Sequence, residues 1–293
     1  MLLQITRDAR LRRAGIDGAM GRSLRGVIRS RRGGHARTWG AGLLIGALTL
    51  SGSVRATPTL PQLVDILKAV DERQKNQGDW HSHIYMEQKE KDKVDVVYEG
   101  EVYRRSQDQK FVIMFTKPKA SQGQGYLRID QNLWFYDPAV GKWERRTERE
   151  RIGGTNSRRS DFDESRLALE YDPEDNGEQK LGAYTAQAMT LKGKPGLDLA
   201  FPVIKLWVDK DTNNVLKRQE FALSGRLLRT SYYPKWKKAH SESKKADVWF
   251  PEEIRFFDEV EKANSTLILI REVEFKGLPT NLFTKAWLES KSR

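Results

Sequence analysis

The sequence predicts a mainly β protein built on one long antiparallel sheet that curls on itself. From residue 81 onward, the sequence contains a dozen short runs of strand character, from which we expect about ten or eleven strands. Turn-forming residues separate most of these runs, which is typical of strands that follow one another in a meander. Two segments have helical spacing instead, and no strand–helix–strand repeat is present. Because so long a sheet must curl, it either closes into a barrel or stays a half-barrel whose open side is plugged by the helices.

Residues 1–56 are predicted to be a cleaved secretory signal, which leaves 57–293 as the mature domain. Six arginines between residues 22 and 37 precede an uncharged run at 38–54, and small residues lead to a cleavage site after Ala56. A retained membrane anchor is the alternative, but the run contains Gly, Ser and Thr and is shorter than the ~20 apolar residues of a span. Export would place the protein in the periplasm of a bacterium with two membranes.

The formal charge of +12 belongs mostly to the leader. Residues 1–56 contain 11 arginines and two aspartates, whereas the remainder contains 41 basic and 38 acidic residues. The mature domain is therefore nearly balanced, and a nucleic-acid partner is not expected. The chain contains no cysteine, which excludes disulfides, thiolate metal sites and cysteine nucleophiles.

The first element of the mature chain is an amphipathic helix at 60–77. Its apolar residues recur at helical spacing, Pro61 suits the first turn, and Gly78 ends the helix. The apolar stripe needs a partner, and a concave sheet is the natural one.

Strands are expected at 81–86, 94–103, 111–115, 126–129, 133–136 and 142–146, and then at 184–191, 203–209, 215–223, 226–233, 248–257 and 265–275. The run at 111–115 is apolar on both faces, so it is either central in a sandwich or has a core on one face and a ligand cavity on the other. Between the two groups of strands, residues 147–161 are polar with a Gly153–Gly154 joint, and 162–171 predicts a short helix. We interpret the aromatic strands as a cavity wall and the polar arm as a mobile flap beside it.

No signature of a known catalytic or cofactor site is present: the sequence lacks G-x-S-x-G, H-E-x-x-H, a phosphate loop and G-x-G-x-x-G. His81 and His83 would share one strand face, but no third metal ligand accompanies them. Asp161, Asp163 and Glu164 are interpreted as helix-capping residues rather than acid–base groups. We therefore expect no catalytic residue, no metal and no cofactor, and predict that the protein is not an enzyme.

One basic cluster stands out, at Arg145, Arg146, Arg149, Arg151, Arg158 and Arg159, of which the first four are the candidate contact residues. It is either a solvated flap balanced by Glu148 and Glu150, or a contact with lipid headgroups or an acidic partner surface.

The central part of the chain resembles the outer-membrane lipoprotein-sorting family, which has the LolA/LolB-like carrier fold. The resemblance rests on the residues at 125–128 (GYLR), 132–138 (NLWFYDP), 143–146 (WERR), 151–155 (RIGGT) and 161–162 (DF). It implies an unclosed antiparallel half-barrel with helices covering the concave side and a hydrophobic cavity for acyl chains. It also implies transfer from an inner-membrane ABC exporter to an outer-membrane acceptor, or association with an RND-type exporter. The lid-latching arginine of such carriers has two candidates here, Arg128 and Arg104.

The function predicted from the sequence is thus a monomeric periplasmic carrier that binds lipoprotein acyl chains or another hydrophobic cargo. The predicted cavity lining is Val112, Met114, Leu127, Ile129, Trp134, Tyr136, Leu206, Leu267 and Leu269. The predicted lid is Phe162, Leu167 and Leu169. This assignment depends on strand register, because a shift of one residue moves every side chain to the other face. The alternative is a periplasmic accessory subunit that docks on an RND or ABC exporter and binds no lipid, and a secreted hydrolase is a third hypothesis, for which the sequence offers no nucleophile–base set.

Overall fold

The computed structural model describes residues 57–75, 77–129, 132–147 and 150–292. The predicted signal at 1–56 lies outside the described residues. In the part that is described, no helix combines the length and the apolar character needed to cross a membrane.

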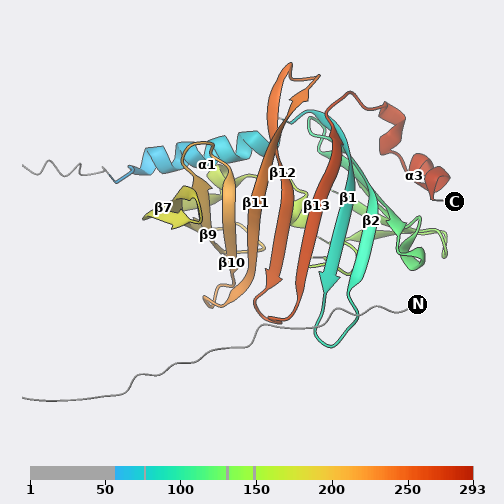
Figure 1. The fold of residues 1–293 in the computed structure, drawn as a ribbon, viewed down its shortest axis with the longest axis horizontal. Coiled ribbons are helices and arrows are strands. Elements are labelled where there is room, and N and C mark those ends of the chain that lie inside the picture. Colours follow the sequence, from blue (N-terminus) through green and yellow to red (C-terminus); the bar gives the residue numbers. More distant parts are fainter. Residues whose placement is uncertain (1–56, 76, 130–131, 148–149, 293) are drawn as a thin grey trace, which may run out of the picture. The chain divides into compact units, whose positions relative to one another are not determined.

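Thirteen strands of the described chain form one antiparallel sheet that does not close into a barrel (Figure 1). The first group is β1 (Asp79–Lys89), β2 (Val96–Arg105), β3 (Lys110–Lys117), β4 (Gly125–Ile129), β5 (Asn132–Asp137) and β6 (Lys142–Arg146). The second group is β7 (Tyr171–Leu181), β8 (Tyr184–Gly193), β9 (Val203–Asp209), β10 (Val215–Phe221), β11 (Leu227–Ser241), β12 (Ala246–Asp258) and β13 (Ser265–Glu274). The predicted fold class, one antiparallel sheet that stays unclosed, is confirmed, and the expected number of about ten or eleven strands is corrected to thirteen in the described residues.

The sheet consists of two meanders that meet in its middle. Its strand order is β6-β5-β4-β3-β2-β1-β13-β12-β11-β10-β9-β8-β7. The chain therefore starts at the centre with β1, reaches one edge at β6, crosses to the other edge at β7, and returns to pair β13 with β1. Two strand predictions need correction. Residues 171–181 form β7, whose Pro173 is tolerated because β7 is an edge strand. The strand expected at 226–233 continues beyond that range, since β11 extends to Ser241.

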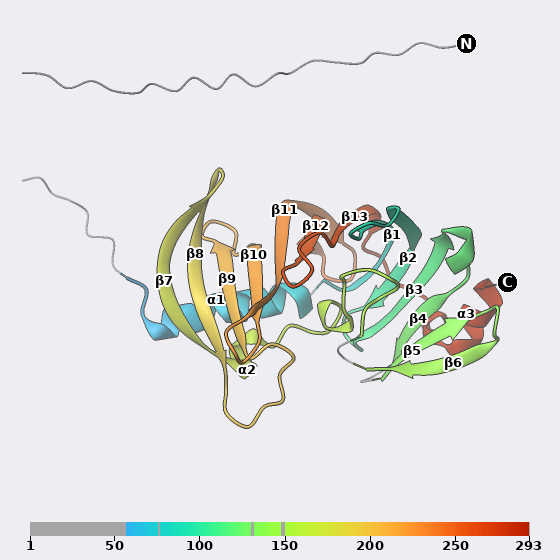
Figure 2. The same cartoon turned by 90° about the horizontal axis from the view of Figure 1, so that it is seen from below.

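The crossing from β6 to β7 runs over one face of the sheet (Figure 2). We call residues 150–170 the strap and the face that it covers the inner face. The strap contains η2 (Arg159–Asp161) and α2 (Leu167–Glu170), so the helix predicted at 162–171 is only one turn long. Ile152, Thr155 and Ser157 are fully buried. The expected mobile polar flap is thus a packed part of the core.

Helix α1 (Leu60–Lys75) covers the inner face at the β7–β10 end of the sheet. Its buried residues Leu63, Leu67 and Val70 contact apolar side chains of β8, β9 and β10 together with Phe201. The helix prediction at 60–77 is confirmed for this range, and Gly78 beyond it has a φ of 82°, in the left-handed region that favours glycine. A second apolar cluster covers the inner face around β1–β5 and includes Ile152 and Phe162 of the strap.

The C-terminal segment covers the opposite face, which we call the outer face. Short helices η3 (Thr280–Phe283) and α3 (Lys285–Lys291) place Leu282, Phe283 and Leu288 against Val112 and Leu127. Helices therefore lie on both faces of the sheet, whereas the sequence predicted helices on the concave side only. The apolar residues of the tail give the physical reason, because they bury outer-face side chains of β3 and β4 that would otherwise be exposed.

Candidate binding pocket

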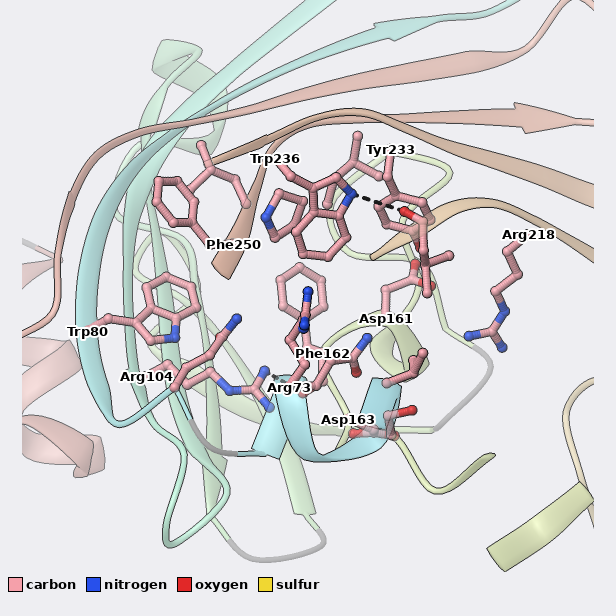
Figure 3. Close-up of a pocket in the computed structure, with 18 of the residues that line it drawn as sticks. Arg73, Trp80, Arg104, Asp161, Phe162, Asp163, Arg218, Tyr233, Trp236 and Phe250 are labelled. Carbon is pink, nitrogen blue, oxygen red and sulfur yellow. Dashed lines mark hydrogen bonds between the residues drawn. The ribbon is translucent and has the colours of Figure 1, made fainter. Parts of the chain in front are cut away.

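A pocket opens on the inner face between the two apolar clusters, where α1 ends (Figure 3). Its volume is about 160 Å³. Residues from α1, from strands of both meanders and from the strap line it. The apolar and aromatic part of the lining is Val70, Trp80, Phe162, Leu167, Leu206, Val215, Tyr233, Trp236, Phe250, Pro251, Ile254, Phe256, Ile270, Val273 and Phe275.

Aromatic rings set the shape of the pocket. Phe275 packs against Trp80 and Phe250, with ring centroids 6.5 and 5.8 Å apart. Trp236 donates its indole N–H to the backbone oxygen of Val215 over 3.0 Å and lies beside Tyr233. These contacts join β1, β10, β11, β12 and the end of β13, so strands of both meanders build the pocket wall.

The strap side of the pocket is held by arginines from both meanders. Arg229 on β11 binds both carboxylate oxygens of Asp161 at 2.7 and 2.6 Å, and also contacts Glu220 at 2.6 and 2.9 Å. From the other meander, Arg128 on β4 lies 2.6 Å from Asp163. The strap is therefore tied to strands on either side of the pocket.

Arg104 and Arg128 also meet at the backbone oxygen of Phe162, to which they donate over 2.9 and 3.3 Å. Both arginines that the resemblance offered as latch candidates thus bind the strap. The side chain of Phe162 packs against Phe111, with ring centroids 5.4 Å apart.

Burial changes the ionisation of several pocket residues. Burial lowers the pKa of Arg104 to about 10, and the nearby charge of Arg128 adds to this effect. Burial alone would raise the pKa of Asp161, but the charge and hydrogen bonds of Arg229 outweigh it and hold the pKa of that carboxyl below its usual range. Burial raises the pKa of Tyr233 to about 12, so this phenol is neutral at physiological pH.

Of the nine residues predicted to line a cavity, Leu206 lines this pocket. The other eight lie elsewhere, most of them on the outer face. Five pack in the outer cluster near α3, namely Val112, Met114, Leu127, Ile129 and Tyr136. Trp134 lies there too, 3.7 Å beneath the Lys285 amine. Leu267 and Leu269 alternate with the inner-face residues Ile268 and Ile270. The correction is therefore one of face: the strands were located, but the wrong side of β3, β4, β5 and β13 was assigned to the cavity.

Of the predicted lid residues, Phe162 and Leu167 line the pocket. Leu169 does not, since it is 65% exposed on the far side of α2.

The four arginines predicted to contact a partner or headgroups are separate from the pocket. Arg146 binds Glu150 at 2.7 Å, Arg151 binds Asp258 at 3.0 Å, and Arg145 is exposed on β6. Arg149 lies outside the described residues. His81 and His83 both contact Glu101 on the outer face, and no group of three metal-ligating side chains occurs in the described ranges.

Sequence reasoning missed Tyr233, Trp236 and Trp80 as pocket residues. On β11 the pairing with β12 shifts register between Tyr232 and Trp236, so that Tyr233 and Trp236 both face inward although they are three residues apart. A bulge of this kind breaks the period of two, so the alternation no longer indicates on which face the residues beyond the bulge lie. Trp80 lies in the first residues of β1, outside the strand expected at 81–86. The sequence feature that could have identified it as a pocket residue is its large aromatic side chain.

The comparisons with known proteins agree with this architecture. A family model with the description "Uncharacterized protein"-like matches residues 107–290. No curated protein sequence matches the chain.

Three crystal structures have the same fold. A LolA superfamily protein from Nitrosomonas europaea is 21% identical, with a TM-score of 0.61 over 76% of this chain and 97% of that chain. A putative outer membrane lipoprotein-sorting protein domain from Vibrio parahaemolyticus is 18% identical, with a TM-score of 0.67 over 77% and 97%. A DUF1329 family protein from Desulfovibrio piger is 19% identical, with a TM-score of 0.67 over 79% and 100%.

Proposed function

The chain belongs to the family whose model matches residues 107–290 and has the fold of LolA-like lipoprotein-sorting proteins; from this premise we propose that it is a periplasmic carrier of acyl chains. The observation that carries the proposal is the inner-face pocket, which α1, the strap and strands of both meanders line with aliphatic and aromatic side chains. The protein acts by binding and release, as a monomer, and not by catalysis.

Burial of apolar surface supplies the affinity. Each methylene removed from water contributes about 0.8 kcal/mol, so even part of a chain gives useful binding. The pocket of about 160 Å³ is smaller than the ~300–1,000 Å³ of common ligand sites. Uptake of a full chain therefore requires α1 or the strap to move away from the sheet.

The strap is the segment best placed to act as the lid. Near the pocket it is held by the two arginine hydrogen bonds to the Phe162 oxygen and by the ion pairs of Asp161 and Asp163. Phe162 and Leu167 add apolar packing against the two clusters. Opening the strap would break these buried contacts, so burial of the acyl chain has to offset their loss. The proposed donor is an ABC or RND exporter in the inner membrane, and the proposed acceptor lies in the outer membrane. Both would contact this protein at the opened strap.

The pocket volume also favours a second candidate function. A pocket of only about 160 Å³ is what we expect of a docking subunit of an exporter, and such a subunit binds no lipid.

Mass spectrometry separates the two functions. The protein is purified from periplasm without detergent, its intact mass is measured under native conditions, and bound lipid is extracted. The carrier predicts co-purifying acyl species or uptake of a fluorescent fatty acid. A clean protein mass together with no uptake would exclude the carrier and leave the docking subunit.

A further inference from the structure

At one end of the pocket, two neighbouring hydrogen-bond donors have no acceptor. The Nε of Arg104 and the indole Nε1 of Trp80 are both buried, and neither has a hydrogen-bond partner among the described residues. Trp and Arg side chains only donate, so each of these groups needs an oxygen or another acceptor. An unmet buried donor costs about 1–3 kcal/mol, and such groups in native proteins call for an explanation.

The charge near these donors is also unbalanced. Arg104 has the Phe162 oxygen as its acceptor and Arg73 has the side-chain amide of Asn214; in the described part of the chain, neither arginine lies within ion-pair distance of a carboxylate. The acidic groups of the pocket are engaged elsewhere, Asp161 with Arg229 and Asp163 with Arg128. The end of the pocket formed by Trp80 and Arg104 therefore has positive charge that Asp163 and Glu164 compensate only in part, by attraction at longer range, and Figure 3 shows it opposite Arg218.

We infer that the pocket binds an acyl amphiphile by an anionic head, with carboxylate or phosphate oxygens accepting from Arg104 and Trp80. The inference rests on the proposed carrier function and names the ligand class of that same pocket. The chain of the ligand would follow the apolar wall at Leu206 and Ile270.

Two physical arguments favour an anion over a neutral lipid. An ionised acceptor forms shorter hydrogen bonds that are roughly twice as strong as those of a neutral one. A buried cation without a counterion is costly, so a neutral ester would leave that cost in place. The pKa of Arg104, lowered to about 10 by burial, shows this cost, and a bound anion would raise it again.

The same geometry links the head to the lid. Arg104 donates to the backbone oxygen of Phe162, a neutral acceptor on the strap. An anionic head is the stronger acceptor and competes for this guanidinium. Binding of the head would thus weaken one of the contacts that keep the strap closed.

Isothermal titration calorimetry of the intact protein tests the inference with three ligands of equal chain length: hexadecanoate, hexadecyl phosphate and hexadecanol. We expect the anions to bind at least about tenfold more tightly than the alcohol, which corresponds to ~1.4 kcal/mol. The ratio of the two anions identifies the preferred head. Inorganic phosphate alone is the fourth ligand and is expected to bind much more weakly than hexadecyl phosphate.

Two variants assign the effect to the pocket. Arg104→Gln removes the charge and Trp80→Phe removes only the indole donor, and both should reduce the preference for anions while hexadecanol binding changes little. Trp80→Phe is informative even if Arg104→Gln perturbs the strap, since it keeps the ring. Arg271→Gln is the control, because Arg271 is exposed over Tyr85 on the outer face, next to Ile270 in sequence.

The relative affinities of the ligands decide between the inference and its alternatives. Equal affinity for the alcohol and the anions would overturn the inference but leave the carrier function intact. Binding of inorganic phosphate as tight as that of hexadecyl phosphate would overturn it too, since the chain would then contribute nothing. Absence of binding by all three long-chain ligands would overturn both the inference and the carrier function.

Discussion

Arg229 on β11 and Asp161 on the strap form a two-pronged ion pair, with nitrogen–oxygen distances of 2.7 and 2.6 Å. Arg229 is almost fully buried, and its guanidinium also binds Glu220, which is fully buried. One arginine thus bridges two carboxylates, one on the sheet and one on the segment that crosses it, and Arg218 supplies the second positive charge, 2.9 Å from Glu220. The pair fixes the position of the strap over the inner face.

Arg229→Met should lower the free energy of unfolding by about 3–5 kcal/mol, since it leaves Glu220 and Asp161 without their shared cation. Urea unfolding measures the change. Lys235→Met on the exposed part of β11 is the control and should stay within about 0.5 kcal/mol of the parent. Equal effects of the two substitutions would show that the Arg229 network does not stabilise the fold.

Hydrogen exchange should detect opening of the strap. The amide of Asn156 on the strap donates to the Thr266 hydroxyl on β13 over 2.8 Å. If the strap moves away when an acyl chain enters, this amide exchanges faster in the presence of fatty acid, whereas the amides of β4 do not change. Unchanged protection of Asn156 at saturating fatty acid would exclude the strap as the lid.

Two neighbouring residues on β13 test which face binds cargo. Ile270→Asn places an amide in the pocket wall, where an unsatisfied polar group costs about 1–3 kcal/mol, and should weaken fatty-acid binding roughly 10- to 100-fold. Leu269→Asn makes the same chemical change on the outer face and should leave the dissociation constant unaltered. A fluorescent fatty-acid displacement assay compares them, and the reverse result would return the cavity to the outer face.

Tyr171→Phe should reduce the alkaline sensitivity of the fold. Burial raises the pKa of Tyr171 from 10.0 to about 12, and its hydroxyl donates to the Phe201 oxygen over 2.9 Å. Between these two pH values the unfolded chain loses the proton while the folded protein keeps it, so stability falls as pH rises, by about 2–3 kcal/mol in total.

The Tyr171→Phe variant loses the hydrogen bond, which lowers its free energy of unfolding by about 1 kcal/mol at neutral pH. In return, its stability lacks the decrease at alkaline pH that ionisation of Tyr171 causes. Thermal unfolding at several pH values between 9 and 12, roughly the window set by these pKa values, measures both effects. Tyr184→Phe, at a position 44% exposed, is the control. Parallel pH curves for the parent and Tyr171→Phe would contradict the prediction.

Leu288→Ala tests the contribution of the C-terminal helix. Leu288 is fully buried between α3 and the outer face, close to Gly125. Its truncation should cost about 2–5 kcal/mol and increase binding of a hydrophobic dye at the uncovered Val112 and Leu127. Acyl binding on the inner face should persist at temperatures where the variant remains folded, and its loss there would show that the two faces are coupled.

The alternation of apolar residues located most of the strands and showed that two faces exist, but it did not say which face is which. In β3, Phe111, Val112, Ile113 and Met114 are all apolar, because Phe111 and Ile113 face the inner cluster while Val112 and Met114 face the C-terminal segment. Both faces of this strand are covered by protein. Alternation with a period of two does not tell which face of a strand lines the cavity. That assignment depends on contacts with residues far along the chain.

The strap shows a second limit. Its polar sequence predicted an exposed flap, and its burial depends on partners at distant positions: Arg229 for Asp161, Arg128 for Asp163, and Thr266 for the amide of Asn156. Polar residues become core residues when their partners are supplied by the sheet, and a local pattern does not contain that information.

The pairing of β1 with β13 has a consequence for the order in which the protein folds. Each meander joins strands that are close in sequence and can form by short loop closures, but the seam between them pairs Ile84 with Ile270. Contacts between residues so far apart in sequence form slowly, because the entropy of closing a long loop is lost before the contacts lower the free energy. The central seam would therefore be the last part of the sheet to form, and a nascent chain that has not yet released Glu274 would hold two unjoined half-sheets.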